Sequence, residues 1–188
     1  MEQITIQQAI NLLHENVKSP SLIKHCKAVG FAMRAYAQHF NLTKEEQEKW
    51  EITGILHDFD YEKFPSLDKH PYEGIKILKQ LNYPEEIIKA ILSHGDHTNT
   101  PRVTLMEKTL FAVDELCGFI LALAYVRPLN FNGMSSESVK KALKKKGFAE
   151  KISRNDIEKG IEELQIEPST HLEIVIKALT NNVKEFGF

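Results

Sequence analysis

The chain has 188 residues, of which 42% are hydrophobic and 27% are charged, so it can bury the core of one domain, with or without a small appended part. Its formal net charge of −2 provides no overall field that would attract nucleic acid or an acidic membrane surface. Two cysteines, Cys26 and Cys117, are too few for the disulfide framework of a small secreted protein, which favours a reducing cytoplasm.

Apolar residues recur at spacings of three and four along most of the chain, a pattern typical of amphipathic helices. Ile6, Ile10 and Leu13 show it first, and the alternation expected of strands is nearly absent. The pattern therefore predicts an all-α fold. We expect helices over residues 5–17, 21–41, 43–58, 70–81, 84–94, 104–126, 135–146, 153–164 and 168–186.

Residues that favour helix ends divide this pattern. Ser19 and Pro20 are expected to open the second helix, and Thr43 with Glu46 has the sequence of a capping box at the start of the third. Residues 59–69 and 95–103 each contain a proline and are expected to be loops. Both loops border candidate functional residues, as is common for sites built on rigid helices.

The composition changes after residue 128, where a short linker leads to a helix rich in lysine. We predict a helical domain over residues 1–128 and a C-terminal helical segment over residues 129–188 that packs on the same domain. No internal repeat is visible, so a solenoid of stacked repeats is not expected.

The adjacent pair His57 and Asp58 is the most informative feature of the chain. Both side chains are metal ligands, but such a pair arises by chance in many chains and would need partners. Candidate partners precede and follow it in the order His25, His70, His94 and Asp114.

Two of these partners are expected to point inward. His25 shares a helical face with Val29 and Met33, and Asp114 lies in a strongly apolar helix. Metal sites in helical folds take ligands from several helices that face one interior point. A buried ionised aspartate needs a compensating partner, and a cation is one.

Each candidate also has a purely structural explanation. His25 could be a hydrogen-bonded core or surface histidine, and Asp114 could make a structural hydrogen bond. His70 could cap the helix that follows it, and His94 could end its helix by meeting the macrodipole. His97 could be a ligand, although we favour a substrate contact or a solvated loop residue.

The complete order of these six residues resembles the HD superfamily of metal-dependent phosphohydrolases, a helical group named for its His-Asp pair. The resemblance covers residues 21–126. Residues 56–60 (LHDFD), 70–74 (HPYEG) and 93–94 (SH) are similar to the branch with two additional histidines between the pair and the final aspartate. That branch includes the bacterial diadenosine tetraphosphate hydrolases and, more distantly, the cyclic dinucleotide phosphodiesterases.

The resemblance implies a helical bundle with a site for two divalent metal ions. One ion would be held by His25, His57, Asp58 and Asp114, and the other by His70, His94 and the same Asp58, which would bridge the two. A hydroxide between two such ions can attack phosphorus near neutral pH. Nitrogen and oxygen ligands without thiolate favour Fe or Mn, with Zn, Co, Ni or Mg as alternatives.

The residues that follow the pair depart from the pattern of the resembled family. Its members commonly carry a lysine three residues after the aspartate, where this chain has Tyr61. Lys63 is a candidate replacement that could bind substrate phosphate. Asp60 adds a negative charge beside a site expected to bind an anion. With Asp58 as the central catalytic residue, we expect Asp60, Lys63 or His97 to protonate the leaving group.

Further substrate contacts are candidates from charge alone. Arg127, Lys140 and Lys144 could join Lys63 in binding phosphate, since arginine offers paired donors and lysine a mobile point charge. A solvated basic helix face explains the lysines equally simply.

The leading hypothesis is a phosphohydrolase that acts on a small phosphorylated compound, most plausibly a nucleotide or dinucleotide. A di-iron HD-type oxygenase is one alternative, which iron content and oxygen consumption would distinguish. A non-catalytic ligand-binding module is the other.

The remaining expectations are negative. The N-terminus lacks a basic region followed by an apolar run, and we expect neither a targeting signal nor a stretch long enough to cross a bilayer. No basic hairpin or aromatic platform is evident, so nucleic acid is not an expected partner. The sequence leaves the oligomeric state open.

Overall fold

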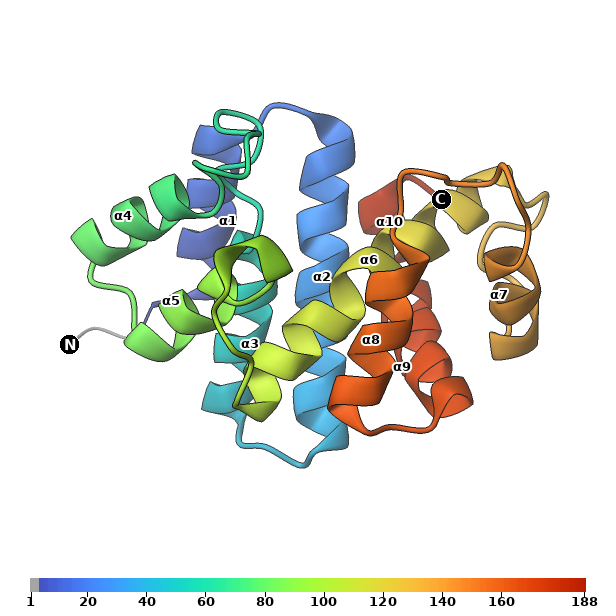
Figure 1. Ribbon diagram of the computed structural model, residues 1–188. Coiled ribbons are helices and arrows are strands. Elements are labelled where there is room, and N and C mark those ends of the chain that lie inside the picture. Colours follow the sequence, from blue (N-terminus) through green and yellow to red (C-terminus); the bar gives the residue numbers. More distant parts are fainter. Residues whose placement is uncertain (1–3) are drawn as a thin grey trace.

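A computed structural model describes residues 4–188 of the chain, so the first three residues of the predicted 1–128 domain lie outside the described range. Within residues 4–188 the chain forms helices and no strand, which confirms the all-α prediction (Figure 1). The helices are α1 (Ile6–Asn16), α2 (Pro20–His39), α3 (Lys44–Leu56), α4 (Tyr72–Gln80), α5 (Glu85–Leu92), η1 (Asp96–Thr98, a 3-10 turn), α6 (Leu105–Val126), α7 (Ser136–Leu143), α8 (Arg154–Leu164), α9 (Pro168–Thr180) and α10 (Val183–Phe186).

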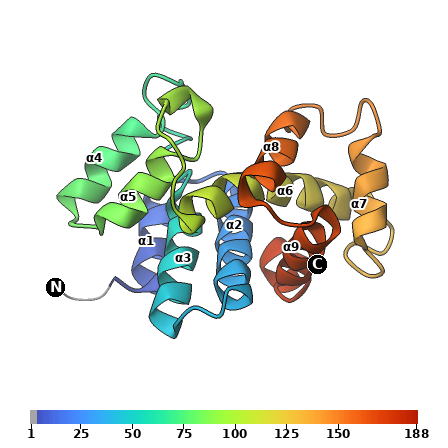
Figure 2. The same cartoon turned by 60° about the horizontal axis from the view of Figure 1, so that its bottom comes forward.

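The helices form two groups joined by α2 and α6. Helices α1, α3, α4 and α5 lie on one side, and α7, α8 and α9 lie on the other, with α6 crossing between them (Figure 2). Val139, Ile157 and Val175 of the C-terminal segment share one buried apolar cluster with residues of α2 and α6. The segment after residue 128 therefore packs on the helices that precede it, while the domain boundary at 128 stays a prediction.

Helices α2 and α3 make the most extensive contact between any two helices of the described chain. They cross at Gly30 and Gly54, where a Cβ added to Gly54 would lie only 2.7 Å from the Cα of Gly30. Because neither residue has a side chain, the two backbones can touch. This close crossing brings His25, near the start of α2, toward His57, which directly follows α3.

Helices α3 and α5 are among those that end earlier than the sequence pattern indicated. Helix α3 stops at Leu56 and α5 at Leu92, so His57 and His94 lie just beyond them rather than within them. In both cases the histidine Nδ1 bonds a carbonyl of the preceding turn, 2.7 Å from the Gly54 oxygen and 2.6 Å from the Ile91 oxygen. The imidazoles thus satisfy carbonyls that a longer helix would have bonded through its backbone.

The remaining differences are local. Ser19 and Pro20 start α2 as predicted. Thr43 accepts the backbone N–H of Glu46, but the Glu46 side chain bonds Lys49 instead of completing the capping box. The predicted helix over 168–186 is interrupted between α9 and α10, at residues 181–182.

Helix α6 contradicts the expectation that no stretch is long and apolar enough to cross a bilayer. Its 22 residues pass that test by length and composition. However, 61% of its most apolar window is buried inside the protein, where it packs against α2, α8 and α9. A core helix satisfies the same criteria, so these properties alone are weak evidence for a membrane span.

A buried histidine connects α9 to the two central helices. The Tyr36 hydroxyl donates to Nδ1 of His171, and Nε2 of His171 donates to the Ala112 carbonyl at 3.1 Å. Burial lowers the pKa of His171 to about 4. The fold therefore holds this side chain neutral at pH values where a free histidine takes up a proton.

We expect Gly54→Ala to lower the free energy of unfolding by about 1–3 kcal/mol, because the new methyl group must separate α2 from α3. Urea denaturation followed by circular dichroism measures this change. Gly118→Ala is the matched control, since its Cβ would meet only ordinary contacts, the nearest at 3.5 Å. The free energy of unfolding of that variant should rise by about 0.5–1 kcal/mol, because alanine favours a helix more than glycine does. Equal effects of both substitutions on the free energy of unfolding would contradict the close crossing.

We also expect His171 to make the protein less stable in acid. The unfolded chain takes up a proton as the pH falls through about 6.5, but the folded chain does so only near the pKa of about 4. The free energy of unfolding should therefore fall by about 2 kcal/mol between pH 7 and pH 5 because of this residue. His171→Gln cannot titrate, so its stability should show a correspondingly smaller loss; identical pH dependence of the two proteins would contradict the buried neutral state.

Candidate metal centre

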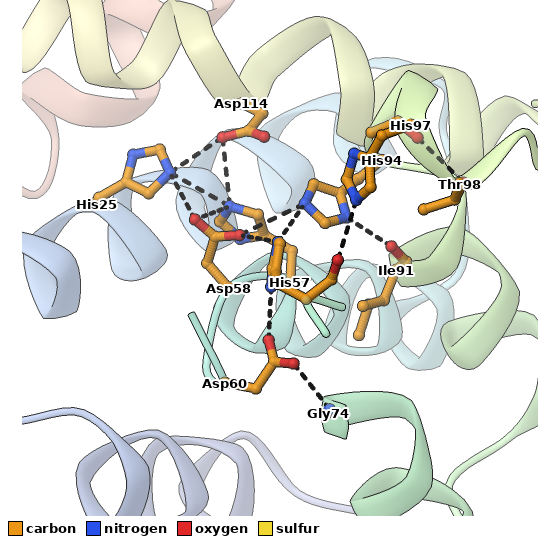
Figure 3. A network of polar contacts seen from close by, with 12 residues as sticks. His25, His57, Asp58, Asp60, Gly74, Ile91, His94, His97, Thr98 and Asp114 are labelled. Atoms are coloured by element: carbon orange, nitrogen blue, oxygen red, sulfur yellow. Dashed lines mark hydrogen bonds and ion pairs between the residues drawn. The ribbon is translucent and has the colours of Figure 1, made fainter. Parts of the chain in front are cut away.

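Six side chains, carried by α2, α6 and the segments beside α3, α4 and α5, lie close together, and Figure 3 labels all of them except His70. Helices α2 and α6 each contribute one of them directly, and four lie in segments just before or after α3, α4 and α5. The six are His25, His57, Asp58, His70, His94 and Asp114. The structure therefore brings together every residue that the sequence predicted as a metal ligand.

One half of this cluster contains His25, His57 and Asp114. The Nε2 atoms of the two histidines are 3.2 Å apart, and they lie 3.0 Å and 3.3 Å from Oδ1 of Asp114. Oδ2 of Asp58 completes this half, at 3.9 Å from His25 Nε2 and 3.6 Å from His57 Nε2. Two imidazole nitrogens and two carboxylate oxygens thus face a common space.

The other half contains His70 and His94. Their Nε2 atoms are 3.2 Å apart and lie 3.2 Å and 3.4 Å from Oδ1 of Asp58. The two oxygens of the Asp58 carboxylate therefore face different halves of the cluster. This is the position that a carboxylate shared between two cations would occupy.

The hydrogen bonds around the cluster orient three of its histidines. Nδ1 of His57 and Nδ1 of His94 face backbone carbonyls, and Nδ1 of His70 lies 2.7 Å from Oδ1 of Asp60. Because these oxygens only accept, the proton of each neutral ring is assigned to Nδ1, and the Nε2 lone pair points toward the cluster. Converging lone pairs cannot bond one another, so the donor set fits a divalent cation in each half.

The charges of the cluster also favour a cation. Burial lowers the pKa of His57, but the carboxylates of Asp58 and Asp114 outweigh burial and raise that pKa to about 9. Burial raises the pKa of Asp58, but the neighbouring histidines hold it well below its usual range. The carboxylates of Asp58 and Asp60 likewise raise the pKa of His70 to about 9 against the effect of burial. Without metal, His57 and His70 therefore retain protons that a metal ion must displace on binding.

Asp60 supports this cluster from behind. It is only 1% exposed, and its Oδ2 accepts the backbone N–H of Gly74 at 2.8 Å while Oδ1 bonds His70. A Cβ on Gly74 would lie 2.8 Å from Cγ of Asp60, so glycine permits this approach. Both oxygens are engaged away from the open side, which corrects the expectation that Asp60 could protonate a leaving group.

A pocket of about 560 Å³ opens onto the cluster. His97 lines it beside His70 and His94, and its contact with a substrate stays a prediction. Its Nε2 lies 3.0 Å from the His70 carbonyl, to which it donates. The imidazole also packs on Gly95, where an added Cβ would lie 2.5 Å from the ring. His97 is thus held at the wall of the pocket by local contacts.

The structure places none of the four predicted phosphate-binding cations in this pocket. Lys63 bonds the end of α1, and Arg127 bonds carbonyls of the turn that follows α6. Lys140 bonds Ser169 of α9, and Lys144 lies at the end of α7 beside a separate basic hollow. These four side chains therefore make their contacts outside the pocket, on other parts of the surface.

Four charged residues of the pocket were not predicted, namely Asp96, Glu115, Lys151 and Asp156. Burial and the charge of Asp114 raise the pKa of Glu115 to about 7, and its Oε2 accepts the Ser153 N–H at 3.1 Å. The sequence could have indicated Glu115, because this second acid directly follows Asp114 within an apolar helix. Lys151 and Asp156 lie in a distant segment that only the fold brings to the pocket.

Comparison with known proteins gives a match to a protein family. A model of the HD domain family matches residues 22–179. No curated protein and no solved structure matches the chain. The match includes all six residues of the cluster and most of the C-terminal segment.

We expect Asp60→Asn to weaken metal binding in the half of the cluster that contains His70 and His94. An amide cannot accept both the His70 and the Gly74 hydrogen bonds, and loss of such a supporting contact typically costs 10–100-fold in metal affinity. Calorimetric titration with Mn²⁺ measures this as a weaker second binding step with an unchanged first step. Asp68→Asn, at an exposed carboxylate, is the control; equal affinities in all three proteins would contradict the supporting role.

Proposed function

The chain belongs to the HD domain family, a superfamily of metal-dependent hydrolases, and on this premise we propose that it hydrolyses a phosphate ester or anhydride of a small compound. The observation that carries the proposal is the placement of Asp58, whose two oxygens each face a different pair of histidine Nε2 atoms. Such a shared carboxylate suits a site for two cations.

In this proposal the two halves of the cluster hold one divalent ion each, with Fe or Mn favoured by the mixed nitrogen and oxygen donors. His25, His57 and Asp114 hold the first, His70 and His94 hold the second, and Asp58 serves both. Such ions, when bound, stabilise negative charge on phosphoryl oxygens and lower the pKa of an attacking water.

The chain's own residues supply position and charge. Asp58 remains ionised because the histidines hold its pKa low, and the backbone carbonyls at Gly54 and Ile91 fix the rings of His57 and His94. Fixed ligands need no reorganisation when charge develops on the substrate. We assign the contact with the leaving group to His97, because it lines the pocket beside the cluster.

The size of the pocket supports a small-molecule substrate. Its volume of about 560 Å³ lies within the range of roughly 300–1,000 Å³ that is usual for such sites. A nucleotide or dinucleotide remains the first class to test. A cytoplasmic location, and the lack of nucleic-acid and membrane partners, remain predictions from the sequence.

We expect Asp58→Ala to lose both metal and phosphatase activity, because the variant leaves each half of the cluster without its shared oxygen. Metal analysis should find up to about two transition-metal ions per wild-type chain, as a two-metal site requires. Phosphate release from a panel of nucleotides and dinucleotides, with added Mn²⁺ or Fe²⁺, measures activity. Asp68→Ala, at an exposed carboxylate, should behave like the wild type.

Unchanged metal content in Asp58→Ala would overturn the bridging role. A metal-loaded wild-type protein that releases no phosphate but consumes oxygen would favour the oxygenase. One that binds ligands with neither activity would favour the binding module.

A further inference from the structure

The outer part of the pocket carries more negative than positive charge. Among residues 4–188, the pocket wall beyond the metal-binding cluster contains the carboxyl groups of Asp96, Glu115 and Asp156, whereas Lys151 is its single lysine and no arginine lines it. Asp96 is neutralised, since its oxygens lie 2.7 Å from Arg102 and 2.5 Å from Lys159.

Glu115 and Asp156 have no such partners. Within residues 4–188 no lysine or arginine lies within 4.0 Å of either carboxylate, so neither is part of a salt bridge with those residues. Both acids contact Ser153 at the start of α8, because Glu115 accepts the backbone N–H of Ser153 and the Ser153 hydroxyl accepts the backbone N–H of Asp156, each at 3.1 Å. Asp156 also lies in the first turn of α8, where a negative charge interacts favourably with the helix dipole. Any substitution of Asp156 must therefore be checked for its effect on the stability of α8.

Another part of the pocket wall is apolar and exposed. Tyr61 and Leu67, both in the segment between α3 and α4, line the pocket and remain 42% and 63% exposed. The Tyr61 ring packs edge-on against His70, with ring centroids 5.1 Å apart. These exposed apolar side chains provide a surface that a bound organic group can cover.

We propose that this pocket selects substrates with a single phosphate group and an apolar leaving group that is uncharged or cationic. The inference rests on the proposed function and narrows its substrate class to phosphate monoesters, which excludes phosphate anhydrides and dinucleotides. The cluster takes the phosphate, Tyr61 and Leu67 contact the organic part, and Asp156 repels any further anionic group. A chain of several phosphates would place extra negative charge beside Asp156, with only Lys151 to compensate.

Three matched ligands test this selection without requiring turnover. They are benzylphosphonates with an ethyl, an aminomethyl or a carboxymethyl group in the para position, which differ in charge but little in size. Their dissociation constants are measured by calorimetry on the Mn²⁺-loaded full-length protein. We expect the carboxymethyl compound to bind about tenfold more weakly than the ethyl compound, and the aminomethyl compound to bind at least as tightly.

A pair of variants assigns the effect to the pocket. Asp156→Asn keeps the shape of the side chain and should reduce the penalty on the carboxymethyl compound about threefold to fivefold, as expected for a partly exposed charge. Glu158→Gln removes the same charge from the same helix but lies outside the pocket, and it should leave the penalty unchanged. Thermal denaturation of both variants checks that α8 is intact.

Each outcome separates the inference from the function on which it rests. Equal or tighter binding of the carboxymethyl compound, or no binding of any of the three, overturns the charge selection. The same holds if Asp156→Asn and Glu158→Gln change the penalty equally. The expected order of affinities, without hydrolysis of the corresponding phenyl phosphates, would instead overturn the proposed hydrolase and leave a selective binding pocket.

Discussion

The contact between α2 and α3 at Gly30 and Gly54 is the constraint on which the metal-binding cluster depends. Neither helix could approach the other so closely with even one methyl group at this crossing. The crossing sets the distance between His25 and His57, and the turn after α3 then directs Asp58 toward the remaining ligands. Helix α6 crosses the same region and supplies Asp114. A packing requirement in the core thus determines the geometry of the chemical site.

The cluster itself is a balance of opposed charges in a largely buried space. Its carboxylates stabilise protons on His57 and His70, and the neighbouring histidines keep Asp58 and Asp114 ionised. In the proposed two-metal site, a divalent cation in each half would replace that arrangement with direct ligation, and the backbone carbonyls and Asp60 already orient the rings for it. The Gly54 and Ile91 carbonyls and the Asp60 carboxylate therefore fix the orientation of the histidine ligands, although none of them belongs to the cluster.

The sequence predicted the helices well because amphipathic spacing is a local property, and it predicted the six clustered residues because their order resembles a known family. It failed where side chains compete with the backbone. His57 and His94 end their helices by bonding carbonyls, and periodicity cannot reveal such bonds.

The sequence also failed to predict contacts between distant segments. The orientation of Asp60 depends on Gly74, and Lys151 and Asp156 reach the pocket only through the packing of α8 on α6. Charge alone selected Lys63, Arg127, Lys140 and Lys144, which the fold directs elsewhere.

The central claim is that one carboxylate, Asp58, is shared by two metal ions. Anomalous X-ray diffraction from crystals of the Mn²⁺-loaded protein, recorded at the manganese absorption edge, tests it most directly. The account predicts two peaks, one among His25, His57 and Asp114 and one beside His70 and His94, each adjoining a different oxygen of Asp58. A single peak, or two peaks of which only one contacts Asp58, would contradict it.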